Sequence, residues 1–467
     1  MGQPQPNEVT IQAMTEAREL SKNFATVDSQ DDILNASLAE DMRIENLRQE
    51  AVKDGRKLVT VREINAIDDI PGADLIKVAT VEGWKVVVKA GEFKEGDLCV
   101  FFEVDSYLPM SDERFKFLEK NATNWQGIPG ARLKTIRLRK QLSQGLALPL
   151  SAFPEILEEI QVKGDAFSNR DAYHNPQIRE DYREMNFTGT LGIFKWEKVM
   201  SAQLAGQAKG DFPSFLRKSD QERCQNMGPA IFGYEATLVE FDASAIPAEV
   251  LNTMRAEVRN VDNKWFKVRP PQASRDTRYE VSLKMDGSSM TVYVKEEEDN
   301  TFLEGVCSRN LDLKMEGNEE NSFVQMAQSG LLEVIRKTRT NIAVQGELMG
   351  PGIQGNRENF KGNRFFIYNI FDIKAGVFLT PDERARLVNA MQTTAVLEEL
   401  NVVIEHVPVL RINVTLDEIG IHNMDDLLKF AVGPSMVNLV REGVVFKAMD
   451  GSQQFKAISN LYLEQEK

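Results

Sequence analysis

One lysine stands just before a glycine-containing turn in the stretch "SLKMDGSSM", residues 282–290. Alternation along "RYEVSLK" places Lys284 on the polar face at the end of a predicted strand. Asp286 and Gly287 favour a tight turn back into "MTVYV", and small residues there let backbone N–H groups approach a phosphate. These residues alone leave two roles for Lys284, a surface cation or a nucleophile.

Four later stretches carry charged or aromatic residues beside predicted turns. They are "GVCSRN", "GELMGPGIQGN", "FIYNIFDI" and "REGVVFKAMDGSQQFKAIS", which contain, in order, Arg309, Glu347, Phe371, Glu442, Lys447 and Lys456. If the two residues at 450–451 form the whole turn of the last stretch, Phe446 faces Phe455. Its two lysines then lie diagonally on one polar face.

The order of these motifs resembles that of covalent nucleotidyltransferases, the polynucleotide ligases and mRNA capping enzymes. Lys-x-Asp-Gly, Ser-Arg, Gly-Glu-x-x-Gly, Phe-Asp-Ile, Glu-Gly-x-Val-x-Lys and Phe-Lys follow one another along the chain. The loop "GELMGPGIQGN" before "FDI" is more similar to nick-sealing phage RNA ligases than to DNA ligases. Together, "RLKTIRLRKQLSQGLALPL", "FPSFLRKSDQERCQN" and "FKAIS" resemble the Deinococcus-type RNA ligase family, whose OB domain precedes the catalytic domain.

The resemblance covers about residues 58–160 and 212–467, and it implies an ATP-dependent RNA ligase. Lys284 would take AMP from ATP and pass it to a 5′-phosphate RNA end, and the adjacent 3′-OH would displace AMP. The implied partner is a nicked RNA or RNA/DNA duplex. The implied contacts to the nucleotide come from Asp286, Gly287, Arg309 (ribose or phosphate), Glu347 (ribose), Phe371 (adenine stacking), Lys447 and Lys456 (both α-phosphate). Phe371 has an alternative role in the core, because its strand is apolar on both faces.

The chemistry sets conditions on the nucleophile. An amine must be neutral to attack phosphorus, whereas a free lysine has a pKa of about 10.4. We expect burial, a metal ion and the cations Lys447 and Lys456 to lower the pKa of Lys284. Mg²⁺, with Mn²⁺ as a substitute, needs only one or two protein carboxylates, and Glu442 is the predicted ligand, directly or through water.

Short β-branched runs separated by turn residues follow one another from Leu58 to Pro109. "LVTVREINAI", "DLIKVATVEGWKVVVKAG" and "DLCVFFEVDSYLP" predict a small antiparallel barrel. The segment "INAIDDIPGADLIKVATVEGWKVVVKAG" resembles tRNA-binding OB modules. We therefore expect an OB-type domain over residues 56–165.

Basic residues are concentrated in the second half of this domain. No acidic residue occurs between Glu119 and Glu155, whereas "GARLKTIRLRKQLSQG" contains Arg132, Lys134, Arg137, Arg139 and Lys140. We predict that these cations contact RNA, and about four phosphate contacts would give a log-log salt slope of roughly −3 to −4. The alternative is a solvated basic strand without a partner.

Strand and helix patterns alternate in the remainder, which predicts an α+β catalytic domain over 211–467. "RYEVSLK", "MTVYV", "IAVQGEL", "RFFIYNIFDI" and "EGVVFKA" are predicted strands of antiparallel sheets, and "ENSFVQMAQSGLLEVIRKT" and "PDERARLVNAMQTTAVLEEL" are predicted helices. Residues 1–55 are expected to form a helical N-terminal arm, and 166–210 a connecting segment.

Composition limits the partners and the compartment. The 467 residues carry a net charge of −15, so a polyanion must bind at a local basic surface. Three scattered cysteines predict neither disulfides nor zinc, and the chain contains no signal peptide or membrane-spanning run. We expect a soluble, cytoplasmic or otherwise intracellular monomer without a membrane partner.

Two other functions are compatible with the motifs. One is another covalent nucleotidyltransferase, a DNA ligase or a capping guanylyltransferase. The other is a non-catalytic RNA-binding protein, an OB module on a decayed nucleotidyltransferase domain. Label transfer from ATP to Lys284 would exclude the second, and a comparison of ATP with GTP would test for the capping enzyme.

Overall fold

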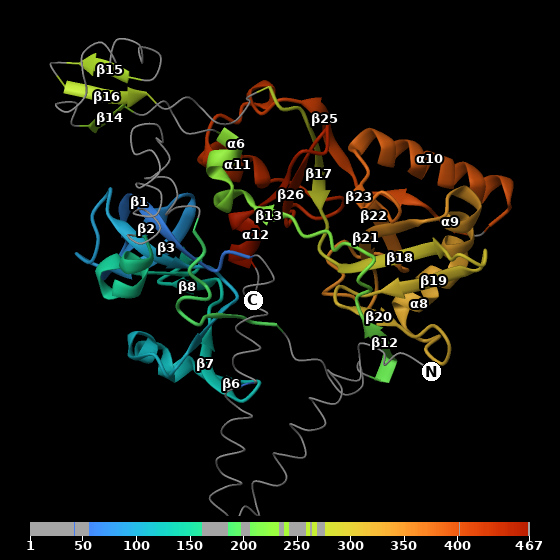
Figure 1. The fold of residues 1–467 in the computed structure, drawn as a ribbon, viewed down its shortest axis with the longest axis horizontal. Helices are drawn as coiled ribbons and strands as arrows, with labels where there is room; N and C mark the ends of the chain where they lie inside the picture. Colours follow the sequence, from blue (N-terminus) through green and yellow to red (C-terminus); the bar gives the residue numbers. More distant parts are fainter. Residues whose placement is uncertain are drawn as a thin grey trace, which may run out of the picture. The chain divides into compact units, whose positions relative to one another are not determined.

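The computed structural model describes residues 42, 56–160, 185–197, 206–232, 238–241, 258–261, 264–268, 276–400 and 402–465. The chain divides into two compact units, which we describe separately (Figure 1). One comprises Thr26–Val199 and Gly228–Ser274, and the other Met1–Ala25, Met200–Met227 and Arg275–Lys467. Apart from Met42, the predicted N-terminal arm lies outside the described residues, as do 166–184 and 198–205 of the predicted connection. Within the described ranges, no helix is both long enough and apolar enough to cross a membrane.

A five-stranded antiparallel sheet dominates the first unit. Its order is β10 (Leu146–Pro149), β4 (Leu98–Phe102), β1 (Val59–Ile70), β2 (Ala73–Val81) and β3 (Trp84–Lys89). The first half of β1 pairs with β4 and its second half with β2, so this one long strand joins the β10–β4 pair to the β2–β3 pair. This arrangement is expected of a small barrel.

The apolar run of β4 is explained by burial on both faces. Cys99 and Phe101 enter one core cluster with Trp84, whereas Val100 and Phe102 enter another with Phe115. Successive strand residues point to opposite faces, so a continuous apolar run requires core on both sides. The same alternation supports the strand assignments made from the sequence.

Two smaller sheets and a hairpin complete the described part of this unit. β11 (Phe194–Lys195), β5 (Ser106–Pro109), β7 (Ile128–Arg132) and β6 (Thr123–Trp125) form one sheet, and β14 (Leu238–Phe241), β16 (Lys264–Val268) and β15 (Val258–Val261) form the other. The hairpin joins β8 (Ile136–Leu138) to β9 (Gln141–Ser143). Contacts group residues 228–274 with this unit, although the sequence assigns 211–467 to one domain; the predicted domain limits stay predictions.

Two antiparallel sheets form the second unit. The larger has the order β12 (Ala208–Asp211), β20 (Leu311–Leu313), β19 (Phe302–Cys307), β18 (Ser288–Glu296), β21 (Ile342–Met349), β22 (Arg364–Asp372) and β23 (Val377–Phe378). In addition, β24 (Glu405–His406) pairs with β22 in parallel. The smaller has the order β13 (Glu222–Arg223), β27 (Gln454–Ile458), β26 (Gly443–Ala448), β17 (Tyr279–Lys284) and β25 (Val409–Val414). Five of these strands, β17, β18, β21, β22 and β26, confirm those predicted from the sequence.

Helices cover the apolar face of the larger sheet. α8 (Ser322–Met326), α9 (Leu332–Thr338) and α10 (Pro381–Leu397) contribute to one core cluster with β18, β21 and β22. A capping box between Thr380 and Glu383 starts α10, the helix predicted for this segment. The helix predicted over 320–338 is confirmed from Ser322 to Thr338, but it is kinked at Gly330, whose φ is 109°, between α8 and α9. This unit also contains α11 (Met424–Ala431) and α12 (Asn460–Gln465), whereas α6 (Gly228–Phe232) belongs to the first unit.

A buried ion pair joins α10 to the smaller sheet. The Arg384 guanidinium donates to both carboxylate oxygens of Glu280, at 2.5 and 2.6 Å, and both side chains are almost fully buried. Arg384 Nε also donates to His406 Nε2 at 2.9 Å, while His406 Nδ1 lies 2.7 Å from the Val407 carbonyl. Because Glu280 lies on the same strand face as Lys284, this pair fixes the strand that carries the candidate nucleophile.

We predict that Arg384→Met lowers the free energy of unfolding by about 3–5 kcal/mol, because Glu280 would keep a buried and unpaired charge. Chemical denaturation measures this change. The matched control is Arg386→Met, an exposed arginine on the same helix, which should change stability by less than about 0.5 kcal/mol. Equal effects of the two substitutions would contradict the importance of the buried pair.

Candidate active site

Lys284 is held by a carboxylate at the end of β17. Its Nζ lies 2.6 Å from Glu442 Oε1, and the two side chains are 26% and 15% exposed. Lys284 pairs with Gly443, so Glu442 immediately precedes the residue opposite the lysine in β26. Two adjacent strands of one sheet therefore bring together residues that are 158 positions apart.

The electrostatics of Lys284 differ from the sequence-based expectation. Burial lowers its pKa, but the carboxylates Glu442 and Glu347 outweigh burial, and the pKa is raised above the ordinary value. The expectation that neighbouring cations lower this pKa is wrong for the protein without nucleotide, since the nearest charge is the carboxylate in contact with the amine. The lysine is therefore protonated here and must lose its proton before it can attack.

Glu347 lies beside the turn that follows Lys284. Its Oε1 accepts a hydrogen bond from the Gly287 N–H at 3.1 Å. Burial raises the pKa of Glu347 to about 7, with Glu442 also raising it and Lys284 opposing both. A Cβ on Gly287 would lie 2.5 Å from the Leu348 carbonyl oxygen, so the backbone here approaches β21 too closely for any side chain.

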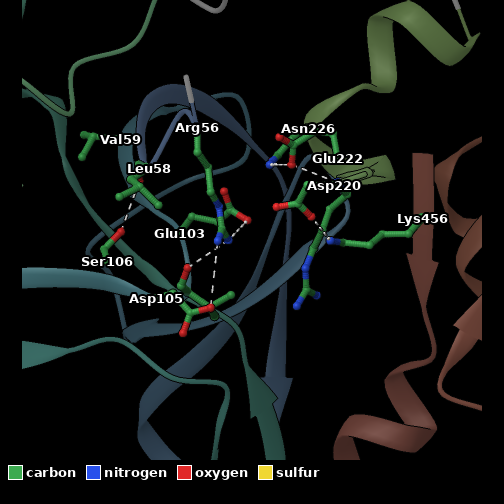
Figure 2. Close-up of polar contacts among 12 residues, drawn as sticks. Arg56, Leu58, Val59, Glu103, Asp105, Ser106, Asp220, Glu222, Asn226 and Lys456 are labelled. Carbon is green, nitrogen blue, oxygen red and sulfur yellow. Dashed lines mark hydrogen bonds and ion pairs between the residues drawn. The ribbon is translucent and has the colours of Figure 1, made fainter. Parts of the chain in front are cut away.

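Lys456 and Arg309 converge on one carboxylate that sequence reasoning missed. Asp220 lies 3.3 Å from Lys456 Nζ and 3.1 Å from Arg309 Nη2, and Figure 2 shows the contact with Lys456. Burial lowers the pKa of Lys456 to about 8, and Lys284 lowers it further while Asp220 opposes the change. Asp220 belongs to "FPSFLRKSDQERCQN", which contributed to the resemblance but was given no site residue.

Lys447 lies deeper than Lys456, between the two sheets. It donates to the Tyr368 carbonyl and, at 2.7 Å, to Asn369 Oδ1 on β22. Burial lowers its pKa well below the usual range, and Arg384 adds to the effect. The predicted pairing of Phe446 with Phe455 is confirmed, and the two rings stack at 4.8 Å. Nevertheless, the two lysines have different partners, and contact of Lys447 with the α-phosphate stays a prediction.

Phe371 packs in the core. It is 4% exposed, belongs to a cluster with Leu216 and Tyr293, and meets Phe378 edge-on at 5.3 Å. Tyr368 lies closer to the turn than Phe371 does, with its Oη 2.8 Å from Ser289 Oγ. Adenine stacking by Phe371 stays a prediction, and the structure favours the alternative role in the core.

One atom in this site fits a divalent cation. Glu442 Oε2 is buried without a hydrogen-bond partner among the described residues, while Oε1 of the same carboxylate contacts Lys284. No group of three or more metal-binding side chains occurs in the described part of the chain. Magnesium requires only one or two protein carboxylates, so Glu442 could hold it together with phosphate oxygens and water.

The five basic residues of the first unit that are predicted to contact RNA fall into two groups. Arg132 pairs with Asp105 at 2.6 Å and lies 3.6 Å from the centre of the Trp196 ring, so its guanidinium is engaged within the domain. Asp105 also lies near Arg56, as drawn in Figure 2. The other four predicted cations are exposed on or beside the β8–β9 hairpin: Lys134, Arg137, Arg139 and Lys140.

The turn of this hairpin adopts an uncommon backbone conformation. Arg139 and Lys140 have φ values of 52° and 68°. Such turns favour asparagine and glycine, and bulky residues are rare in them. The hairpin therefore presents two adjacent cations in a conformation that local preference disfavours.

Comparison with known proteins gives three findings. Residues 58–150 match an OB-fold domain, which confirms the predicted N-terminal module, and residues 277–459 match the RNA ligase family. No curated protein matches the chain. Among solved structures, the chain is similar to Naegleria gruberi RNA ligase in several states.

Three of these structures hold different molecules. Two are variants of that ligase, one with AMP and manganese and one with ATP and manganese, and the third is the ligase with pyrophosphate. The TM-scores are 0.63, 0.62 and 0.63; each structure is 35% identical and covers 88% of this chain and 99% of the relative. Similarity of this degree extends over nearly all of both chains, and the chain therefore belongs to the RNA ligase family.

Proposed function

We propose that this RNA ligase uses ATP to seal 5′-phosphate and 3′-OH RNA ends at nicks in duplexes, through AMP linked to Lys284. The observation that carries the proposal is the contact of Lys284 with Glu442 beside Glu347, at the turn predicted to bind phosphate. The Naegleria relatives hold ATP, which is the substrate of such a first step, pyrophosphate, which is its leaving product, and AMP, which is released in the last step. The finer assignment to the Deinococcus-type family and the monomeric state are parts of the same proposal.

The first step is displacement at the α-phosphorus. The Lys284 amine loses a proton, its nitrogen forms a bond to phosphorus, and the bond from phosphorus to the pyrophosphate oxygen breaks. Glu442 accepts the proton or holds the amine while water accepts it, and Lys456 and Arg309 offer positive charge to the phosphates. A magnesium or manganese ion at Glu442 would supply further positive charge for the leaving pyrophosphate.

The later steps transfer and release AMP. An RNA 5′-phosphate oxygen attacks the phosphorus of lysyl-AMP, and the nitrogen–phosphorus bond breaks. The RNA 3′-OH then attacks the 5′-phosphate, and AMP leaves with the bonding electrons. The exposed cations of the β8–β9 hairpin are the proposed RNA contacts of the OB domain.

We predict that wild type becomes covalently labelled by ATP carrying a labelled α-phosphate, and that Lys284→Ala does not. The change removes the only proposed nucleophile, and denaturing gel electrophoresis detects the label. Lys295→Ala on β18 is the control and should label like wild type. GTP in place of ATP tests for a capping enzyme. Absence of label on wild type with either nucleotide would favour the alternative of a non-catalytic RNA-binding protein.

We predict that ATP binding weakens as pH rises through about 8. Lys456 has a lowered pKa, so its positive charge is present below that pH and is lost above it. For a Lys284→Arg variant, which cannot react but keeps the charge that lowers the pKa of Lys456, the Kd should increase about tenfold from about pH 7 to about pH 9. Adding Lys456→Arg should abolish this dependence, because arginine stays charged. A constant Kd in the variant that retains Lys456 would contradict the role of this lysine.

We predict that Arg137→Ala combined with Arg139→Ala weakens binding and sealing of a nicked duplex but leaves lysine adenylylation unchanged. Loss of two phosphate contacts should reduce the salt slope of binding by about two. Lys89→Ala with Lys94→Ala removes equal charge from exposed positions elsewhere on the domain and should change little. Unchanged nick sealing in the hairpin variant would place the RNA contacts elsewhere.

A further inference from the structure

The C-terminal helix reaches the turn that follows the nucleophile. Tyr462 on α12 donates a hydrogen bond from Oη to Asp286 Oδ2, at 2.9 Å. The Arg357 guanidinium lies 4.5 Å from the centre of the Tyr462 ring, and its Nε is 3.9 Å from the same carboxylate oxygen. Asp286 Oδ1 makes no hydrogen bond to a described residue. The carboxylate is thus held through one oxygen, and the Asp286 side chain is 24% exposed.

The start of the same helix is hydrogen-bonded to the backbone of Glu442, whose carboxylate contacts Lys284. The Ser459 N–H donates to the Glu442 carbonyl at 2.8 Å, and Ser459 is completely buried. Ser459 Oγ accepts from the Tyr462 N–H at 3.2 Å, which starts the helix and orients the tyrosine. Ser459, which precedes α12, and Tyr462, which lies in it, therefore connect the backbone of Glu442 with the side chain of Asp286.

We propose that Tyr462 is a positioning residue for lysine adenylylation and acts by fixing the Asp286 carboxylate. The inference rests on the proposed function, in which Lys284 receives AMP. An aspartate side chain on a turn can rotate, and a phenol donor together with a guanidinium restricts it to one orientation. With Oδ2 so engaged, Oδ1 stays available for the nucleotide side of the turn.

The backbone of the turn does not depend on this contact. Gly287 N–H is held by Glu347, and Lys284 pairs with Gly443 in the sheet. Loss of the Tyr462 hydroxyl should therefore release the carboxylate without unfolding the hairpin. This separation allows a positioning role to be distinguished from a structural one.

The test compares two deletions of a buried phenol hydroxyl. Tyr462→Phe keeps the ring beneath Arg357 and removes the hydroxyl that donates to Asp286. Tyr279→Phe removes a hydroxyl that accepts from Gln453 at the opposite end of β17. At saturating ATP, Tyr462→Phe should slow label transfer to Lys284 by about 10–100-fold, the usual effect of removing a group that orients a catalytic residue. Tyr279→Phe should stay within about twofold of wild type, and both variants should melt at similar temperatures.

A double-mutant cycle shows whether the effect passes through Asp286. Single-turnover label transfer is measured for Asp286→Ala with and without Tyr462→Phe. If Tyr462 acts through Asp286, adding Tyr462→Phe to Asp286→Ala should slow label transfer by less than about a further twofold. Effects that multiply, or a Tyr462→Phe rate equal to that of wild type, would overturn the inference. Absence of label on wild type would instead refute the proposed function on which it rests.

Discussion

The contact between Lys284 and Glu442 is the interaction on which the site depends. An ammonium at 2.6 Å from a carboxylate keeps its proton, so this contact holds the candidate nucleophile in the unreactive form. The same carboxylate has a buried oxygen with no hydrogen-bond partner in the described part of the chain, and this oxygen suits a cation. A cation there would compete with the lysine for Glu442, and in the proposed mechanism this competition would release the amine from its carboxylate partner.

The surrounding structure maintains this geometry through buried polar ties between layers. Arg384 of α10 holds Glu280 of β17, and Lys447 of β26 holds Asn369 of β22. Each tie joins the smaller sheet to the larger sheet or to a helix that covers it. Burial of charge is costly unless it is paired, so these ties are specific to one arrangement of the layers. They position the strand that ends at Lys284.

The sequence predicted elements and motif order better than side-chain partners. Alternation placed Glu280, Ser282 and Lys284 on one face, and the two-residue turn predicted the pairing of Phe446 with Phe455. It could not show that Arg132 is engaged by Asp105 and Trp196, because those partners come from distant segments. Likewise, Asp220 and Tyr462 have no local pattern that indicates a site, and only the fold brings them to Lys456 and Asp286. Gly330 is the opposite case, since a glycine inside a helical pattern was a visible signal of the kink.

The central claim is that Lys284 forms a covalent bond to AMP. Intact-mass spectrometry after incubation with ATP and Mg²⁺, followed by peptide mapping, tests it most directly. The account predicts a mass gain of one AMP, located on the peptide that contains Lys284 and reversed by added pyrophosphate. An adduct on another residue, or no adduct when pyrophosphate is removed enzymatically, would contradict it.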